Sequence, residues 1–193
     1  MINHDLQYIF IHIPKTGGNS VKKVLGIDCH SHRALREYKV AFSVLQLNSK
    51  FKTYFKFCFV RNPFDRFVSA YNYLKNGGIS PMDKADCERF NLRNRTFKDF
   101  VLSQEGILSQ QHFKPQSHYT NPQEDLDFIG RLENFDIDFL NLCDLLKIPP
   151  CQPPHLNNSS HSHYTEYYDS ESRKAVERLY GEDLEAFGYN FGD

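Results

Sequence analysis

The sequence predicts an α/β fold in which a mostly parallel central sheet is flanked by helices. Two observations carry this prediction. Short apolar segments typical of buried strands occur at residues 7–13, 54–60 and 126–130. Each is followed closely by a segment with helical character, and strands that alternate with helices through short turns are typical of parallel sheets.

The first strand and helix surround a glycine pair. Residues 7–13, QYIFIHI, form an apolar run that Pro14 ends, as expected of a buried strand. After Gly17 and Gly18, the side chains of Val21, Val24 and Leu25 recur at helical spacing, and Gly26 follows as a stop signal. We therefore expect a strand, a short loop and a helix within the first 26 residues.

The second strand and helix give the clearest local signals. Residues 54–60, YFKFCFV, are rich in aromatic and β-branched types. Asn62 and Pro63 then supply an N-cap and a first helical residue, which predicts a helix over about 63–75 that ends near Gly77.

The signals for secondary structure are weaker in the remainder of the chain. A third strand is expected at 126–130 and a helix at about 134–147, with further helices from about 170 onwards. Gly, Pro, Asn, Ser and His accumulate at 76–95, 104–124 and 147–163, so we expect loops there.

Composition excludes several classes of protein. The 193 residues are 40% hydrophobic and 24% charged, which is typical of a globular chain with one core. No apolar run approaches the roughly 20 residues of a membrane helix. Five scattered cysteines without a C-x-x-C motif favour neither a disulfide framework nor a zinc site, and indicate a reducing compartment.

Charge is distributed unevenly along the chain. The formal net charge is -1, yet residues 11–75 contain 12 Lys or Arg against three Asp or Glu. A basic first third on a nearly neutral protein suggests a localised anion site, and it disfavours a nucleic-acid-binding protein with an extended basic surface. The alternative is an ordinary solvated basic surface.

The segment after the first strand has the composition of an anion cradle. Glycines let backbone N–H groups approach an oxyanion, the helix start adds partial positive charge, and Lys15 adds a full one. Thr16 and Ser20 add hydroxyl donors. A Walker A loop places its lysine after the last glycine, whereas Lys15 precedes both glycines, which weakens a nucleotide-kinase interpretation. The alternative is a tight turn without a ligand. The predicted anion-binding residues are Lys15, Thr16, Gly17, Gly18, Asn19 and Ser20.

A second candidate follows the second strand, in RNPFDRFVSAY. Arg61 leaves the carboxyl end of a strand, the edge at which open α/β sheets bind ligands. Ser69 lies about two helical turns onward, roughly 10 Å along the axis, so a phosphate that contacts both lies along the flank of the helix. The alternative is an ion-paired arginine and a packing serine.

Together these two segments resemble the sulfotransferases that use 3′-phosphoadenosine 5′-phosphosulfate (PAPS), and in particular the carbohydrate sulfotransferases. The loop from Pro14 to Ser20 matches the family's 5′-phosphosulfate loop, and Arg61 to Tyr71 matches its 3′-phosphate motif. Weaker resemblance continues at QHFKPQ, at FIGRLENFDIDF and at HYTEYYDSES and LYGEDLEAFGY within residues 163–189. The resemblance implies a P-loop-type three-layer α/β fold, a single domain over 1–193, Lys15 beside the bridging oxygen, and Arg61 and Ser69 at the 3′-phosphate.

Histidines are the candidates for the base that accepts the hydroxyl proton. His30 and His32 are two residues apart, so an extended backbone places both on one face, and a pKa near 6.5 suits the task. An H-x-H in this interval resembles that of heparan sulfate 2-O-sulfotransferase, which implies that His30 or His32 is the base and that Arg33 meets an anionic acceptor. Spacing does not distinguish the two, and both histidines could instead be ordinary surface residues.

Other histidines and one late loop complete the predicted site. His112 and Lys114 occupy a basic, aromatic segment suited to a sugar acceptor, although plain loop packing explains them equally well. His161 and His163 repeat the H-x-H pattern without carboxylate or cysteine partners at ligand spacing, so we expect no metal site. By resemblance, Ser159 belongs to a loop that closes over the donor nucleotide.

We therefore expect a sulfotransferase that binds PAPS, needs no metal and acts on a hydroxyl group, with a carbohydrate as the expected acceptor. The carbohydrate sulfotransferases that this sequence resembles carry a membrane anchor. No apolar run here is long enough to span a membrane, so we expect a cytoplasmic protein without a membrane span. The alternatives are a P-loop nucleotide or nucleoside kinase and a non-catalytic nucleotide-binding module. The acceptor and the oligomeric state are not specified by the sequence.

Overall fold

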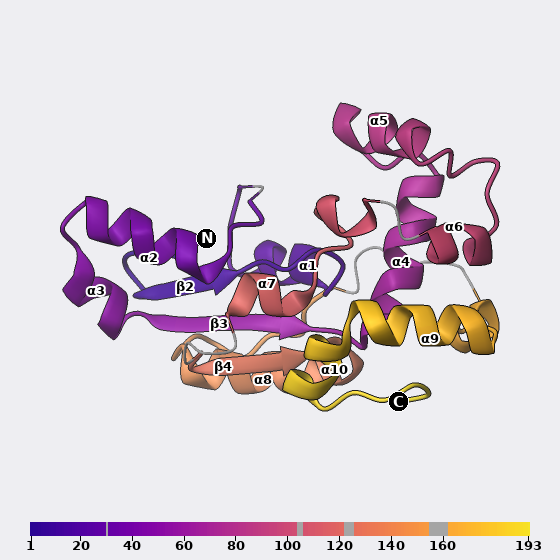
Figure 1. The fold of residues 1–193 in the computed structure, drawn as a ribbon. Coiled ribbons are helices and arrows are strands. Elements are labelled where there is room, and N and C mark those ends of the chain that lie inside the picture. Colours follow the sequence, from indigo (N-terminus) through magenta and orange to yellow (C-terminus); the bar gives the residue numbers. More distant parts are fainter. Residues whose placement is uncertain (30, 104–105, 122–125, 155–161) are drawn as a thin grey trace. The chain divides into compact units, whose positions relative to one another are not determined.

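The computed structural model describes residues 1–29, 31–103, 106–121, 126–154 and 162–193 (Figure 1). The chain divides into two compact units. Unit 1 comprises Met1–Arg61 and Gln116–Asn158, and unit 2 comprises Asn62–Pro115 and Ser159–Asp193. Each unit is described by itself.

Unit 1 contains a four-stranded sheet in the order β1-β2-β3-β4. The strands β2 (Tyr8–Ile11), β3 (Phe55–Val60) and β4 (Phe128–Arg131) are parallel, and the short β1 (Ile2–Asn3) pairs antiparallel with β2. All of β2 and five of the six residues of β3 are buried, as expected of strands covered on both faces. The mostly parallel sheet confirms the predicted α/β class.

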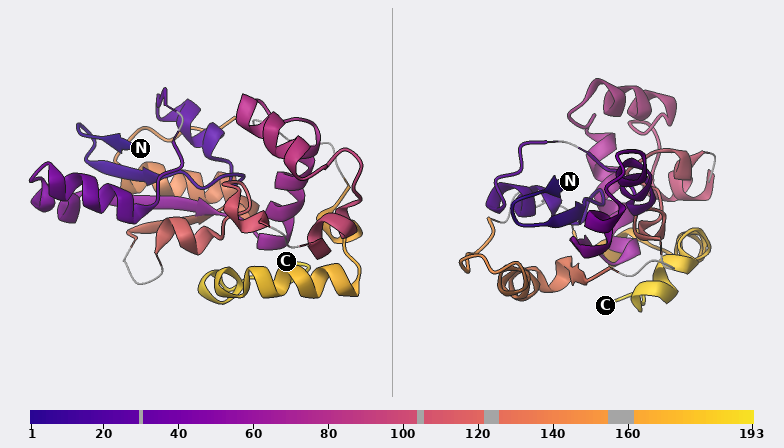
Figure 2. Two further views of the ribbon diagram at one scale, coloured as in Figure 1. Left: turned by 45° about the horizontal axis from the view of Figure 1, so that its top comes forward. Right: turned by 90° about the vertical axis from the view of Figure 1, so that its left-hand side faces the viewer.

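Helices cover both faces of this sheet (Figure 2). On one face, α1 (Gly18–Val24) and α8 (Phe135–Leu145) pack against the aromatic side chains of the strands, where Phe57, Phe59 and Phe139 belong to one buried cluster. On the other face lie α2 (Leu35–Val44) and α7 (Gln116–Thr120), and α3 (Asn48–Thr53) follows α2. Unit 1 therefore has three layers, with the ends of β2 and β3 pointing toward the predicted anion-binding residues.

Unit 2 is helical in its described part. Its helices are α4 (Pro63–Lys75), α5 (Pro81–Arg89), α6 (Phe97–Ser103), α9 (Ser170–Leu179) and α10 (Gly181–Phe187). Short 3-10 turns occur at Ile107–Ser109 and Tyr164–Tyr167, and in unit 1 at Leu132–Asn134. Phe67, Phe100 and Phe113 lie at the centre of its core, each at most 1% exposed.

Local sequence signals located the main elements well. The Asn62 side chain accepts a hydrogen bond from the Phe64 N–H at 3.0 Å and Pro63 begins α4, so the predicted helix start is confirmed. Gly26, one residue past the C-cap of α1, has φ 62°, the left-handed conformation that ends helices. The predicted strands 7–13, 54–60 and 126–130 correspond to β2, β3 and β4.

The prediction of loop at 76–95 is wrong, because α5 lies within it. Ser80 caps this helix by accepting from the Asp83 N–H at 3.1 Å, and Pro81 is its first residue. Only Asp83 and Cys87 of α5 are buried, so the helix lacks the apolar periodicity on which the prediction depended. Similarly, α7 occupies part of 104–124, and α2 was not predicted.

Candidate active site

The loop between β2 and α1 has a strained, closely supported backbone. Lys15 has φ 69° and Gly17 has φ 80°, both in the left-handed region. The Thr16 hydroxyl, in a residue that is 1% exposed, donates to the Ile13 carbonyl at 3.0 Å, and the Ser20 N–H donates to the Gly17 carbonyl at 2.9 Å. The loop is therefore a tight turn that leads directly into the first turn of α1.

Packing requires both glycines of this loop. A Cβ on Gly18 would lie 2.0 Å from Cδ2 of His12, and a Cβ on Gly17 would lie 2.7 Å from Cδ1 of Leu132. The His12 ring thus rests directly on the start of α1. The sequence pointed to close approach of backbone to an anion, and the structure adds that these Cβ positions are already filled by side chains of unit 1.

Arg61 meets this loop within unit 1. The arginine directly follows β3, and its Nη1 lies 3.4 Å from the Lys15 carbonyl oxygen, a long hydrogen bond that orients more than it stabilises. Because β2 and β3 are parallel neighbours, their carboxyl ends bring the two segments to one edge of the sheet. Two cationic residues predicted from separate motifs are therefore placed together.

His32 is oriented by the end of β2. Its Nδ1 lies 2.8 Å from the His12 carbonyl oxygen, and the His12 and His32 ring centroids are 4.4 Å apart. A carbonyl only accepts, so Nδ1 of His32 carries the proton in this bond and the lone pair of the neutral ring is on Nε2. Arg33 is exposed, and His30 lies outside the described residues.

The other predicted residues belong to unit 2. Ser69 is 7% exposed on α4. His112 is 7% exposed, and its Nε2 lies 3.1 Å from Oδ1 of Asp83. Lys114 is half-buried, and its carbonyl accepts from the Arg66 guanidinium at 2.7 Å. Ser159 and His161 lie outside the described residues, whereas His163 is exposed with Nδ1 2.8 Å from the Thr165 hydroxyl.

Three supporting residues, two in unit 1 and one in unit 2, were not predicted from the sequence. His12 links the start of α1 to His32, and the side-chain amide of Gln116 binds the backbone of Arg61. Arg66, 1% exposed, donates to the carbonyls of His112 and Lys114 at 3.2 Å and 2.7 Å. For Arg66 the sequence offered one signal. A charged residue on the apolar face of a helix needs hydrogen-bond acceptors from the neighbouring backbone or side chains.

Asp83 is held ionised in unit 2 by its hydrogen bonds. Burial alone would raise the pKa of this carboxyl, but donors from Ser80, Tyr73 and His112 lower it well below its usual range. Burial, together with the hydrogen bond to Asp83 and its negative charge, raises the pKa of Tyr73 to about 12. Asp83 therefore joins the start of α5 to α4 and to the segment that carries His112.

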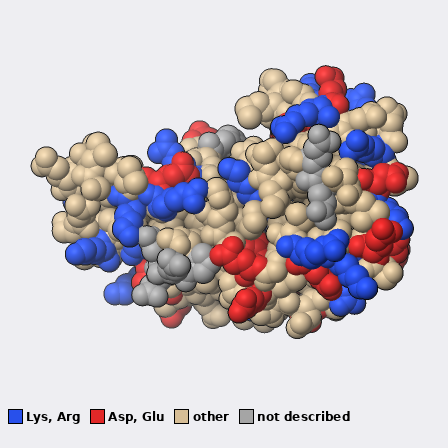
Figure 3. Space-filling view, viewed as in Figure 1, with Lys and Arg blue, Asp and Glu red and all other residues tan. Residues whose placement is uncertain are grey.

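Surface charge differs between the two units. Lys and Arg side chains gather around α3 of unit 1, whereas both signs alternate over α9 of unit 2 (Figure 3). Among the described residues, no cluster of three or more His, Cys, Asp or Glu side chains has the arrangement needed to hold a metal ion. Within that same part of the chain, no helix has both the length and the apolar character to cross a bilayer.

Comparison with known proteins identifies the family of this chain. A model of a group described as the sulfotransferase family matches residues 1–190. The chain belongs to the sulfotransferase family. It is therefore a transferase, and sulfuryl transfer is its general reaction. A protein of Archaeoglobus fulgidus described as uncharacterized is 33% identical over 118 residues, which cover 59% of this chain and 85% of that protein. No solved structure gives a significant match.

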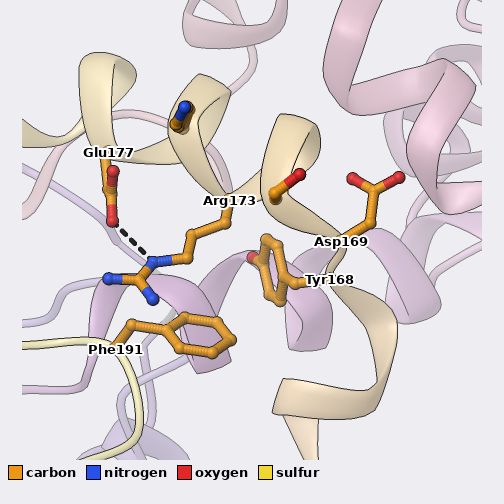
Figure 4. A pocket seen from close by; sticks show the side chains of 7 residues that line it. Tyr168, Asp169, Arg173, Glu177 and Phe191 are labelled. Carbon is orange, nitrogen blue, oxygen red and sulfur yellow. Dashed lines mark hydrogen bonds and ion pairs between the residues drawn. The ribbon is translucent and has the colours of Figure 1, made fainter.

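The sulfotransferase also has a shallow pocket beside α9 in unit 2 (Figure 4). Its volume is about 370 Å³, and Tyr168, Arg173 and Phe191 form much of its wall. The Arg173 guanidinium lies 4.7 Å from the centre of the Phe191 ring, and its Nε lies 2.7 Å from Oε1 of Glu177. None of the predicted site residues is among the residues that line this pocket, and the function proposed below does not use it.

Proposed function

We propose that this sulfotransferase takes the sulfuryl group from PAPS and transfers it to a hydroxyl group of a carbohydrate. The observation that supports PAPS as the sulfuryl donor is the 3.4 Å contact between Nη1 of Arg61 and the carbonyl oxygen of Lys15. A nucleotide with phosphate on both sides of its ribose needs donors for two anionic groups. A guanidinium beside a loop of backbone N–H groups supplies donors of both kinds.

The donor set fits such a nucleotide chemically. Residues Lys15 to Ser20 offer an ammonium, two hydroxyls and backbone N–H groups, and Arg61 adds a planar guanidinium, so the side chains present donors to anionic oxygens. PAPS supplies a sulfuryl group already bonded to a phosphate leaving group. In this proposal Lys15 stabilises the charge on that phosphate, and Arg61 with Ser69 binds the 3′-phosphate. Ser159 is assigned to the same nucleotide by resemblance.

The base is proposed to be His32 or His30, and the geometry supports His32. Its Nδ1–H is held by the His12 carbonyl, so the lone pair of the neutral ring is on Nε2, which then accepts the hydroxyl proton. The contact with His12, whose ring rests on Gly18, ties this base to the start of α1. The ring is thereby fixed relative to the loop proposed to bind the donor.

The acceptor is assigned to Arg33 and to the segment 112–114. Arg33 is exposed next to His32 in the chain, and Lys114 is half-buried. The buried His112 ring contacts Asp83 and so fixes the segment 112–114. We therefore propose that His112 positions Lys114. We further propose that residues 1–193 act as one domain with a P-loop-type fold, which the match over residues 1–190 supports.

Binding of the reaction product, adenosine 3′,5′-bisphosphate, tests the proposal. Titration calorimetry of the wild-type protein should detect binding, and Lys15→Ala and Arg61→Ala should each weaken it by about tenfold or more, the effect of losing one charged hydrogen-bond donor. Lys174→Ala, at an exposed lysine of α9 and outside the basic residues 11–75, is the matched control and should leave the affinity unchanged.

Failure of the folded wild-type protein to bind millimolar bisphosphate would contradict the proposed donor. Tighter binding of Mg²⁺-ATP than of the bisphosphate would instead favour the kinase alternative. Binding without transfer to any hydroxyl acceptor would favour a nucleotide-binding module.

A further inference from the structure

The peptide of Arg61 lies just beyond the sheet. The last pair between β3 and β4 is Val60↔Arg131, and the last pair between β2 and β3 is Ile11↔Cys58. Arg61 comes one position after the first of these pairs, where the strand ladders no longer supply partners for its backbone. A buried N–H or C=O group at such a position requires another partner.

Gln116 supplies both partners. The Arg61 N–H donates to Oε1 of Gln116 at 2.9 Å, and Nε2 of Gln116 donates to the Arg61 carbonyl at 2.9 Å. The Gln116 residue is 0% exposed, so water does not compete for these bonds. The Gln116 side-chain amide thus takes the place of a neighbouring strand as the hydrogen-bond partner of the Arg61 backbone. It fixes the backbone for one residue beyond the end of β3.

Gln116 is itself anchored within unit 1. It is the first residue of α7, and its carbonyl accepts from the Thr120 hydroxyl at 3.4 Å. Two residues along the same helix, His118 contacts α2, with its Nε2 3.4 Å from Nη2 of Arg36. The Gln116 side-chain amide that binds the Arg61 backbone is therefore anchored to a helix and is not part of a surface loop.

The Arg61 side chain is held at its other end by the loop. Its contact with the Lys15 carbonyl is long at 3.4 Å, so this contact alone does not fix the guanidinium. A rotation of the Arg61 peptide would swing the guanidinium away from the loop. We propose that Gln116 is a positioning residue that preorganises the Arg61 guanidinium beside the Lys15 loop for anion binding. This inference rests on the proposed function, in which Arg61 binds a phosphate group.

Gln116→Met tests the role directly, because methionine has similar length and forms neither hydrogen bond. Its affinity for adenosine 3′,5′-bisphosphate, measured by calorimetry well below the melting temperature, should fall about tenfold or more, as for other residues that orient a binding side chain. Gln116→Glu keeps the oxygen that accepts from the Arg61 N–H but sets a carboxylate oxygen against the Arg61 carbonyl, so it should not restore the affinity.

Gln110→Met is the matched control. Gln110 is 4% exposed and also makes two hydrogen bonds, to the His112 N–H at 2.5 Å and to Oδ2 of Asp86 at 3.1 Å. Its loss should lower the melting temperature comparably while leaving bisphosphate affinity within twofold of wild type. General destabilisation would weaken binding in both variants and would overturn the inference.

A double-mutant cycle with Arg61→Ala separates positioning from any other effect. The Arg61→Ala protein keeps the backbone that Gln116 binds but lacks the guanidinium. Adding Gln116→Met should therefore cause no further loss of affinity, whereas equal losses in both backgrounds would overturn the inference. If wild-type protein binds and Gln116→Met binds equally well, only the inference fails. If folded wild-type protein does not bind, the proposed function fails as well.

Discussion

The imidazole of His32 is oriented by main-chain atoms at the end of β2. The His12 carbonyl fixes its tautomer at 2.8 Å, and the His12 ring, 4.4 Å away, rests on Gly18. The position of the proposed base therefore depends on the same few residues that shape the loop between β2 and α1. Its imidazole is assigned to the acceptor hydroxyl and has no assigned contact with the nucleotide, so binding and turnover should respond differently to its loss.

Alanine at His32 or at His30 tests this separation. At least one variant should bind adenosine 3′,5′-bisphosphate as wild type does while its kcat falls by about 10² or more, the usual contribution of a general base. His163→Ala, in the second H-x-H pair and exposed in the structure, is the control for removal of an imidazole. Full turnover in both His30→Ala and His32→Ala would show that neither residue is the base.

Residues close together in the sequence were predictable from local spacing. Lys15 and Arg61 were assigned to one ligand by the resemblance, whereas the contacts of His12 and of Gln116 were not predicted. Lys15, Thr16 and Ser20 lie within six positions, so their pattern is visible in the sequence. The contacts of His12 with His32 and of Arg61 with Gln116 span 20 and 55 positions. Nothing in local spacing reveals such pairs, because the parallel sheet and α7 bring them together.

At the scale of elements, α5 shows how polar contacts define a helix that lacks an apolar stripe. Oδ2 of Asp83 accepts from the Tyr73 hydroxyl at 2.8 Å and from the Ser80 N–H at 2.9 Å, and its Oδ1 meets His112. A Cβ on Gly78 would lie 2.2 Å from Cβ of Asp83, so the turn from α4 is closed tightly on this residue. The carboxylate thus anchors the start of α5 and the segment before α7.

Asp83→Asn should lower the free energy of unfolding at pH 7 by about 2–4 kcal/mol, because it removes a buried charged acceptor. The pKa of Asp83 is lowered in the folded state, so its stabilisation is complete above the unfolded pKa of about 3.9 and is lost as pH falls below it. Urea denaturation should therefore show a smaller difference between variant and wild type at pH 3 than at pH 7.

Glu88→Gln provides the control for Asp83→Asn, since Glu88 is exposed on the same helix. It should change stability by less than about 0.5 kcal/mol at either pH. A stability difference for Asp83→Asn that stays constant down to pH 3 would show that its charge is not what holds α5.

Two kinds of signal, a run or stripe of apolar residues and a helix cap, explain which elements the sequence predicted. The strand β3 and the helix α4 combine a run of buried residues with Asn62 and Pro63 at their junction, so pattern and cap agree. Helix α2 buries Leu35, Tyr38 and Phe42, but its exposed Val40 and Val44 blur the apolar stripe. Helix α5 has the cap without the stripe. The prediction therefore failed for α5, which lacks an apolar stripe, and for α2, whose apolar stripe is obscured by apolar residues on its exposed face.

At the scale of the whole molecule, charge is separated along the chain although the total is nearly neutral. Residues 11–75 hold 12 Lys or Arg and three Asp or Glu within a net charge of -1. Lys15 and Arg61 belong to this basic portion, together with the exposed lysines of α3. An anionic ligand bound at the Lys15 loop would therefore feel the field of more cations than it contacts.

Salt should consequently weaken binding of the anionic nucleotide selectively. Raising NaCl from about 50 mM to about 500 mM shortens the screening length from roughly 14 Å to roughly 4 Å, so the contribution of cations beyond the contacting groups is lost. The affinity for adenosine 3′,5′-bisphosphate should fall about tenfold in calorimetric titrations, while the weaker affinity for uncharged adenosine should stay nearly constant. Equal salt dependence for the two ligands would mean that the basic portion contributes no field at the nucleotide and that the phosphates bind elsewhere.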